Sequence, residues 1–151
     1  LPLEDAETVT LETLLENFVK EEPLDGEYYC FHCQGPQSGQ QKTSICQPLP
    51  PVIIVQLKRF TFDETDEKVN TFVRYPIENW NVDNSNDSLY DLVAVSMHIG
   101  NLTRGHYTTF ARLDSSRQWY HFNDSQVDCI GNDAERLVNQ NAYILVYLKK
   151  N

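Results

Sequence analysis

Residues 52–60 have the sequence Val52-Ile53-Ile54-Val55-Gln56-Leu57-Lys58-Arg59-Phe60, a nearly continuous apolar run rich in β-branched side chains. Such side chains favour an extended backbone, and a run without polar alternation is typical of a strand buried on both faces. The prolines of the preceding segment, residues 48–51, interrupt any local pairing. We therefore expect a strand over residues 52–60 with both faces covered.

Further strand signals follow this run, each bounded by turn residues. They lie at residues 90–97, 107–112, 119–122 and 143–148, with turns at 100–105, 114–117 and 131–133 and a short helix around 133–139. Residues 62–88 are acidic and rich in asparagine, which predicts weak strands joined by surface loops. The order of these segments predicts an antiparallel sheet.

A helix and a short strand are predicted before the run. Leu11, Leu14, Leu15 and Phe18 have the i, i+3, i+4, i+7 spacing of an amphipathic helix, with Thr10 as N-cap, so we expect a helix over residues 11–21. Residues 26–33 predict a short strand that enters a loop over residues 34–41. The fold class is therefore α+β and strand-dominated, with one domain in 151 residues.

Composition excludes several function classes. The chain has 12 lysines and arginines against 22 aspartates and glutamates, a net charge of −10 without a basic run, which argues against nucleic acid and favours a basic partner. Its apolar runs are too short to span a bilayer, and residues 1–10 do not have the pattern of a signal peptide. Four unevenly spaced cysteines do not make a disulfide framework. We expect a soluble protein of the cytoplasm or nucleus that binds no membrane.

A histidine and an amide–carboxylate pair lie at the ends of two neighbouring predicted strands. Gly105-His106-Tyr107 begins one strand and Asn123-Asp124 ends the next, so a hairpin would bring Asn123 or Asp124 beside His106. An imidazole oriented by an amide or carboxylate is two thirds of a Cys-His-Asn/Asp constellation. A hydrogen-bonded structural histidine has the same spacing, which leaves both interpretations open.

Three stretches in the same order extend this pattern. They are Leu-Pro-Pro-Val-Ile-Ile-Val-Gln-Leu-Lys-Arg-Phe at 49–60, Tyr-Asp-Leu-Val-Ala-Val-Ser-Met-His-Ile-Gly at 90–100 running on to Gly-His-Tyr-Thr at 105–108, and Trp-Tyr-His-Phe-Asn-Asp-Ser-Gln-Val at 119–127. Together with a closing strand at 142–147, they resemble the ubiquitin-specific proteases, or ubiquitin carboxyl-terminal hydrolases. The resemblance covers nearly the whole chain. It implies that residues 1–151 are the C-terminal, palm and fingers portion of one catalytic domain of a papain-like cysteine protease.

The resemblance implies hydrolysis of the bond after the C-terminal glycine of ubiquitin. His106 would be the general base, Asn123 its orienting group and Asp124 a neighbouring support. The family usually has an aspartate at the position of Asn123, so this chain departs towards an uncharged amide. His98, Gly105 and Tyr107 would line the channel for the ubiquitin tail. A structural histidine at 98 and a core aromatic at 107 are the alternatives.

The family's asparagine- and glycine-rich cysteine box, which carries the nucleophile, has no counterpart in these residues. Cys46 and Cys129 lie in no glycine-rich turn that opens a helix, where a thiolate would be favoured. We expect a fragment, or one chain of a two-part catalytic domain, that is inactive alone and needs the cysteine-box portion as partner.

Cys30 and Cys33 have the spacing of a zinc knuckle but make only half of a four-ligand site. By resemblance to members with zinc-bearing fingers, the other pair would lie in the missing portion, and a vestigial pair is the alternative. We expect catalysis to require no cofactor, and a structural zinc is possible at these cysteines. Asn101-Leu102-Thr103 matches the short N-glycosylation pattern, which we attribute to chance.

Ubiquitin and ubiquitinated proteins are the partners that the resemblance implies. The acidic chain suits the basic tail of ubiquitin through long-range attraction, although a merely solvated acidic surface explains the charge equally well. A ubiquitin-binding module without catalysis is the main alternative function. A zinc-dependent interaction domain is a third.

Overall fold

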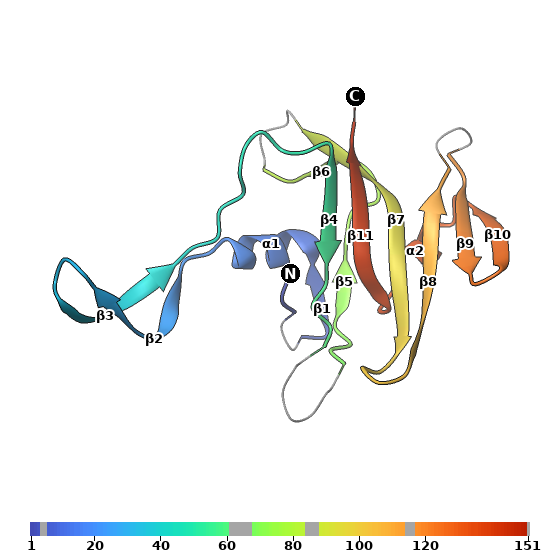
Figure 1. The fold of residues 1–151 in the computed structure, drawn as a ribbon. Helices are drawn as coiled ribbons and strands as arrows, with labels where there is room; N and C mark the ends of the chain where they lie inside the picture. The colour runs from blue at the N-terminus through green and yellow to red at the C-terminus, as the bar shows by residue number, and fades with distance from the viewer. Residues whose placement is uncertain (4–5, 61–67, 84–87, 114–116, 151) are drawn as a thin grey trace.

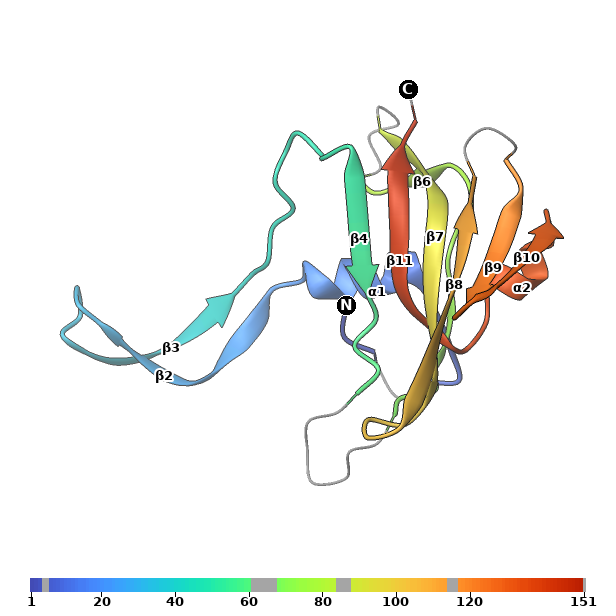
Figure 2. The same ribbon diagram turned by 45° about the vertical axis from the view of Figure 1, so that its right-hand side comes forward.

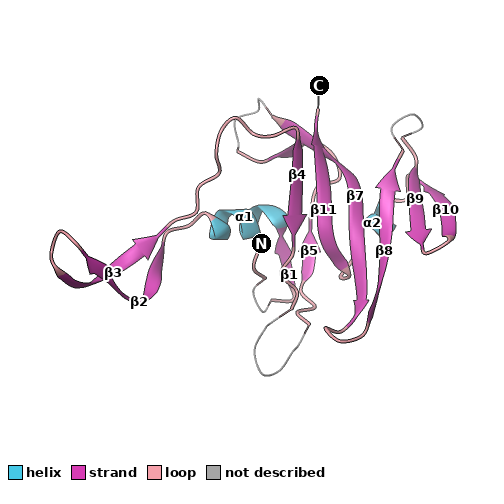
Figure 3. Ribbon diagram, in the orientation of Figure 1, coloured by secondary structure: helices cyan, strands magenta, loops and turns pink. Residues whose placement is uncertain are grey.

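Strands dominate the computed structural model, which describes residues 1–3, 6–60, 68–83, 88–113 and 117–150 (Figures 1 and 3). In chain order the elements are β1 (Thr8–Thr10), α1 (Leu11–Phe18), β2 (Glu22–Cys30), β3 (Gly35–Gln41), β4 (Val52–Gln56), β5 (Phe72–Arg74), β6 (Trp80–Asn81), β7 (Leu89–Gly100), β8 (Gly105–Arg112), β9 (Trp119–Asn123), β10 (Gln126–Gly131), α2 (Ala134–Leu137) and β11 (Ala142–Lys149). The predicted strand-dominated α+β class is confirmed.

One seven-stranded antiparallel sheet forms the body of the molecule. Its strand order is β10-β9-β8-β7-β11-β4, and β6 pairs with β7 beside this path (Figure 2). The four predicted strands after residue 88 are β7, β8, β9 and β11, each slightly longer than expected. Strand β10 was missed because residues 126–131 carry aspartate and glycine, which disfavour strands, and only pairing with β9 makes them one.

Strand β4 is shorter than predicted and is covered on one face only. The strand ends at Gln56, and its side chains alternate, with Val55 8% exposed and Ile54 68% exposed. The expectation of two buried faces was wrong because only one face of β4 meets the hydrophobic core, while Ile54 on the other face is exposed. An apolar run alone does not reveal such a position.

Arg59, in the segment after β4, is buried and hydrogen-bonded to neighbouring backbone. Its side chain is fully buried, and Nε and Nη1 donate to the carbonyl oxygens of Ala142, Val69 and Thr71 at 2.5, 3.0 and 2.9 Å. Burial lowers the pKa of the guanidinium to about 10, partly offset by Tyr75. Arg59 therefore ties the chain that follows β4 to β11 and to residues 69–71.

Helix α1 begins as predicted and ends early. The side chain of Thr10 accepts the N–H of Thr13 at 3.2 Å, and Leu11 and Leu14 are buried against the sheet. The predicted helix reached residue 21, whereas the observed one stops at Phe18, because the chain then turns into β2 at Glu22. None of the helices among the described residues is long and apolar enough to cross a membrane.

Strands β2 and β3 form a hairpin that projects away from the main sheet (Figures 1 and 2). Residues 34–41 were expected to be a loop because they are rich in glycine, glutamine and proline. They form β3 instead, with Cys30 opposite Gly35 and Tyr29 opposite Pro36. Pairing with β2 overrides their weak strand propensity.

Short strands account for the weak signals between residues 62 and 88. β5 pairs in parallel with β1, a strand that the sequence did not indicate, and β6 pairs with the start of β7. Residues 62–67 and 84–87 of that segment, and residues 114–116 of the predicted turn, lie outside the described residues.

Candidate active site

Strands β8 and β9 bring an imidazole and a side-chain amide to the same end of the sheet. Strand β8 begins there and strand β9 ends there (Figure 1). The two strands are antiparallel, with Phe110 opposite His121. Because side chains alternate along a strand, His106 and Asn123 lie on the face that this pair shares. Nε2 of His106 is 2.6 Å from Oδ1 of Asn123.

The contact determines which ring nitrogen carries the proton when the amide oxygen faces the ring. A side-chain carbonyl oxygen only accepts, so Nε2 of His106 is the donor. In the neutral ring, Nδ1 then has a lone pair that can accept a proton from another group. The pair is thus a base with one acceptor nitrogen, oriented by an uncharged amide.

Asp124, the other candidate orienting group, lies in the turn between β9 and β10. Its φ is 51°, in the left-handed region that aspartate tolerates in tight hairpin turns. No contact joins its carboxylate to His106 within the described residues. The structure therefore brings Asn123, and not Asp124, to the imidazole.

A tight turn connects β7 to β8 immediately before His106. Oδ1 of Asn101 accepts the N–H groups of Thr103 and Arg104 at 3.1 and 2.8 Å and the Thr103 hydroxyl at 3.0 Å. Gly100 has a φ of 122°, and a Cβ there would lie 2.3 Å from the Arg104 carbonyl oxygen, so glycine is required. The turn predicted at residues 100–105 is therefore confirmed, and Asn101, which the sequence marked as a glycosylation pattern, supplies the side-chain acceptor within it.

His98, predicted to line a substrate channel, is 3% exposed on β7. Its ring lies among Phe60, Tyr107 and Tyr143, with centroid distances of 5.1, 4.6 and 6.2 Å. Its Nδ1 has no hydrogen-bond partner among the described residues. Burial, and then the charge of Lys68, lowers the pKa of this imidazole, which favours the neutral ring.

Gly105 and Tyr107, the other two predicted channel residues, lie at the surface beside the candidate base. Gly105 is exposed and Tyr107 is 53% exposed, with one side of its ring against His98. These two residues, with His106 between them, form an accessible start to β8.

The cysteines lie apart from the imidazole. Cys30 ends β2 and Cys33 follows in the turn, where its N–H is 3.5 Å from Sγ of Cys30. Hydrogen bonds from the backbone of Cys33, and then of His32, lower the pKa of the Cys30 thiol, which favours a thiolate. No group of three or more potential metal ligands occurs within the described residues. The pair therefore offers two ligands and a backbone that stabilises charged sulfur.

Neither of the other thiols belongs to the candidate site. Cys46 is exposed in the segment between β3 and β4, and Sγ of Cys129, in β10, is 3.6 Å from Oε1 of Gln118. All four cysteines are free.

Comparison with protein families adds a match over most of the chain. The profile of the family described as "Ubiquitin carboxyl-terminal hydrolase" matches residues 9–147. Ubiquitin carboxyl-terminal hydrolase 9 of Arabidopsis thaliana is 39% identical over 150 residues, which cover 93% of this chain and 16% of that protein. Ubiquitin carboxyl-terminal hydrolase 15 of Homo sapiens is 34% identical over 151 residues, 94% of this chain and 15% of that protein.

Solved structures share the fold as well. The yeast SAGA DUBm with an Sgf73 mutant contains a chain that is 31% identical with a TM-score of 0.76, covering 100% of this chain and 34% of that one. The SAGA Ubp8/Sgf11/Sus1/Sgf73 DUB module bound to ubiquitin aldehyde gives 29% identity and a TM-score of 0.69, over 99% of this chain and 35% of that one. The chain thus spans about one sixth of the curated relatives and one third of these solved chains.

Proposed function

We propose a function from one premise, that this chain belongs to the ubiquitin carboxyl-terminal hydrolase family, whose profile covers residues 9–147. The chain provides the general base, His106, and its orienting group, Asn123, to a thiol-dependent deubiquitinating hydrolase. That enzyme cleaves the isopeptide or peptide bond after the C-terminal glycine of ubiquitin. The observation that carries the proposal is the 2.6 Å contact between Nε2 of His106 and Oδ1 of Asn123.

The proton transfers follow from this contact. Nδ1 of His106 takes the proton of a cysteine thiol, and the thiolate adds to the carbonyl carbon of the ubiquitin glycine. The imidazolium then gives the proton to the leaving amine as the C–N bond breaks, which leaves a thioester. Nδ1 next takes a proton from a water whose oxygen attacks the thioester, and returns it to the departing sulfur. Ubiquitin leaves with a free carboxyl group.

Asn123 orients the ring through both halves of the reaction. Its amide oxygen accepts the Nε2–H of His106 in the neutral ring and in the imidazolium. Because the amide has no charge, it stabilises the imidazolium less than a carboxylate would. Asp124, one residue further, contributes at most a charge nearby.

We propose that the nucleophilic cysteine belongs to a cysteine-bearing portion outside these 151 residues. The exposed positions of Cys46 and Cys129, neither at a helix N-terminus, support this assignment. The chain alone is then inactive, and its partners are that portion, ubiquitin and ubiquitinated proteins, in the cytoplasm or nucleus. Related structures of the SAGA DUB module bound to ubiquitin aldehyde and to monoubiquitin support ubiquitin as the substrate.

The surface beside His106 suits an extended peptide. Gly105 presents bare backbone and Tyr107 a half-exposed ring, so a chain ending in glycine can approach closely. We assign the ubiquitin tail to these two residues, with His98 beneath them.

For the fingers hairpin, β2 and β3, we propose half of a structural zinc site. Cys30 and Cys33 are two thiol ligands, and the backbone N–H groups that lower the pKa of Cys30 suit a thiolate ligand. Metal analysis of the chain with and without its cysteine-bearing portion tests this. About one equivalent of zinc in the reunited domain, lost in Cys30→Ser with Cys33→Ser, is expected, and no zinc in either sample would end the idea.

The activity is tested with a ubiquitin-linked fluorogenic amide. We expect no turnover by the chain alone, turnover by the chain reunited with its cysteine-bearing portion, and loss of that turnover in His106→Ala. His32→Ala, which removes an exposed imidazole of the hairpin, is the matched control. Turnover by the chain alone that Cys46→Ala or Cys129→Ala abolishes would refute the assignment of the nucleophile. Ubiquitin binding without turnover by the reunited domain would favour a binding module.

A further inference from the structure

We infer that His98 is a positioning residue. Its buried ring occupies the space that a side chain at Gly105 would take, and so it fixes the backbone position from which the side chain of His106 extends. The importance of His106 rests on the proposed function. The packing relationship does not, and it can be tested without activity.

The fit between the two residues is steric. A Cβ atom on residue 105 would lie 2.0 Å from Nε2, 2.8 Å from Cε1 and 3.0 Å from Cδ2 of His98. The φ of Gly105 lies outside the left-handed region, so this angle does not require glycine. The ring of His98 is therefore the obstacle to a side chain at 105.

The ring of His98 has little freedom to move away. The backbone N–H of His98 donates to the carbonyl oxygen of Asn141 at 2.8 Å, and Nζ of Lys68 donates to the backbone carbonyl oxygen of His98. Tyr107, opposite in β8, lies against one side of the ring, and Phe60 meets it edge-on. The backbone and the ring are thus both held.

The contacts of His98 indicate a role in shape more than in polar recognition. Its Nδ1 is buried without a hydrogen-bond partner among the described residues, and the side chain is 3% exposed. Burial and the nearby ammonium of Lys68 favour the neutral ring by lowering its pKa. The Nε2 end of this buried ring faces Gly105, where a Cβ atom would lie 2.0 Å from Nε2.

Gly105 transmits this contact to the base because it directly precedes His106. Gly105 pairs with Gly100 and His106 with Ile99, so a shift of Gly105 moves the first pairs of the β7–β8 hairpin. The 2.6 Å contact between His106 and Asn123, which lies on another strand, depends on the backbone position of His106. A displacement of about 1 Å can cost about a hundredfold in rate.

A double-mutant cycle at positions 98 and 105 tests the inference. Gly105→Ala is disruptive when His98 is present, because the new Cβ and the ring claim the same space. In a His98→Ala background, the same Cβ enters a cavity, so Gly105→Ala adds little. Such non-additivity is the signature of a direct steric contact.

The first readout needs no catalysis. In the 151-residue chain with ¹⁵N-labelled histidine, long-range NMR spectra report the tautomer of His106 and the proton shared with Asn123. We expect the Nε2–H form in the unaltered chain, its signal shifted or broadened in His98→Ala and in Gly105→Ala, and no further change in the double variant relative to His98→Ala. His32→Ala is the control, and backbone amide spectra identify any variant that fails to fold.

The second readout is the rate of the reunited catalytic domain. We expect kcat to fall about a hundredfold in Gly105→Ala and in His98→Ala, with no additional fall in the double variant. KM should change little in His98→Ala; it is not used for Gly105→Ala, because Gly105 is assigned to the ubiquitin tail. A raised KM with kcat unchanged in His98→Ala would show a substrate contact and overturn positioning.

The two readouts separate this inference from the proposed function. If the reunited domain is inactive, the proposed function fails while the NMR cycle still decides the inference. If Gly105→Ala disturbs the His106 signals equally in both backgrounds, or if His98→Ala leaves them unchanged, the inference is refuted whatever the activity.

Discussion

His106 and Asn123 meet through Nε2 and Oδ1 at 2.6 Å, although 17 positions separate them in the chain. The amide accepts without carrying a charge, so it can fix the tautomer of the ring but adds no ionic stabilisation when the ring is protonated. A carboxylate at this position would both orient the ring of His106 and stabilise its charge. Substitutions of Asn123 can therefore separate these two effects.

Asn123→Ala removes the orienting acceptor. In the reunited catalytic domain we expect kcat/KM to fall by about a hundredfold or more, because the imidazole loses its preferred tautomer and orientation. Asn123→Asp keeps an acceptor at the same distance and adds a charge, so it should retain or raise the rate. Hydrolysis of a ubiquitin-linked fluorogenic amide measures both. Equal losses in the two variants would mean that Asn123 does not orient the base.

His98 should make the stability of the chain depend on pH. Because burial and Lys68 lower its pKa in the folded chain, the unfolded chain binds more protons between that lowered value and about 6.5. The stability that the neutral ring contributes is therefore present above about pH 6.5 and is lost as pH falls through the lowered pKa.

Urea unfolding from pH 7.5 to pH 5 measures this dependence. Between pH 7.5 and pH 5, the free energy of unfolding should fall further in the unaltered chain than in the His98→Gln variant. Glutamine cannot titrate at that position. Lys68, Tyr107 and Tyr143 also face the ring and remain in the variant, so the comparison cancels their contributions. His32→Gln, at an exposed site, should keep the full dependence. An unchanged slope in His98→Gln would contradict the burial of a neutral imidazole.

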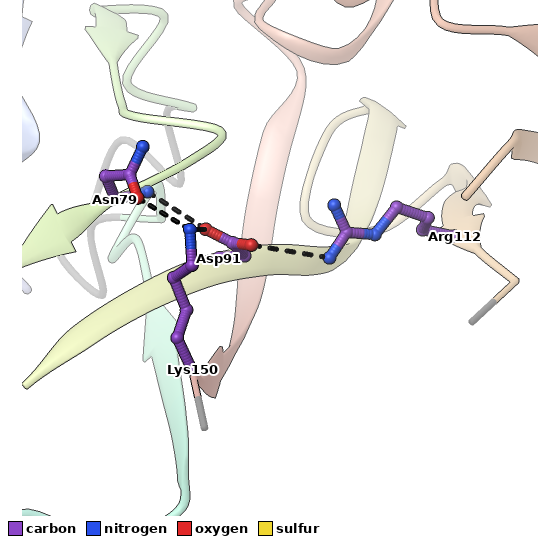
Figure 4. Close-up of polar contacts among 4 residues, drawn as sticks. All are labelled: Asn79, Asp91, Arg112 and Lys150. Atoms are coloured by element: carbon purple, nitrogen blue, oxygen red, sulfur yellow. Dashed lines mark hydrogen bonds and ion pairs between the residues drawn. The ribbon is translucent and has the colours of Figure 1, made fainter.

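Asp91 joins three segments at the opposite end of β7 from the candidate site (Figure 4). Its Oδ1 accepts the N–H of Asn79 at 3.0 Å, and its carboxylate lies 3.8 Å from Arg112 and 3.7 Å from Lys150. The ion pairs are long, so the hydrogen bond should contribute most. Asp91→Ala should lower the free energy of unfolding by about 1–3 kcal/mol.

Asp91→Asn separates the two contributions. It keeps an oxygen for the N–H of Asn79 and removes only the charge. The free energy of unfolding should therefore fall clearly less in Asp91→Asn than in Asp91→Ala. The exposed Asp128, in β10, is the matched control, for which substitution by alanine should change stability by less than about 0.5 kcal/mol. Urea denaturation compares them. If the asparagine variant is as unstable as the alanine variant, the ion pairs dominate.

The sequence predicted what depends on local patterns and missed what depends on neighbours. Thr10 as N-cap and the strands β7 and β8 on either side of the turn at residues 101–104 follow from spacing and turn residues, and both agree with the structure. The choice between Asn123 and Asp124 depends on where one turn falls, because adjacent residues point to opposite faces. The burial of His98 depends on Phe60 and Tyr143, which are distant in sequence and invisible to any local pattern.

The run at residues 52–60 gives the most direct test of this difference. Ile54 and Val55 are equivalent in sequence terms, yet Ile54 is 68% exposed and Val55 is 8% exposed in the hydrophobic core. In the purified chain, Ile54→Lys should change the free energy of unfolding by less than about 0.5 kcal/mol, while Val55→Lys should cost several kcal/mol because it buries a charge. Urea denaturation of the two single variants measures the contrast. A large loss in Ile54→Lys would mean that this face of β4 is covered in solution, as the apolar run alone predicts.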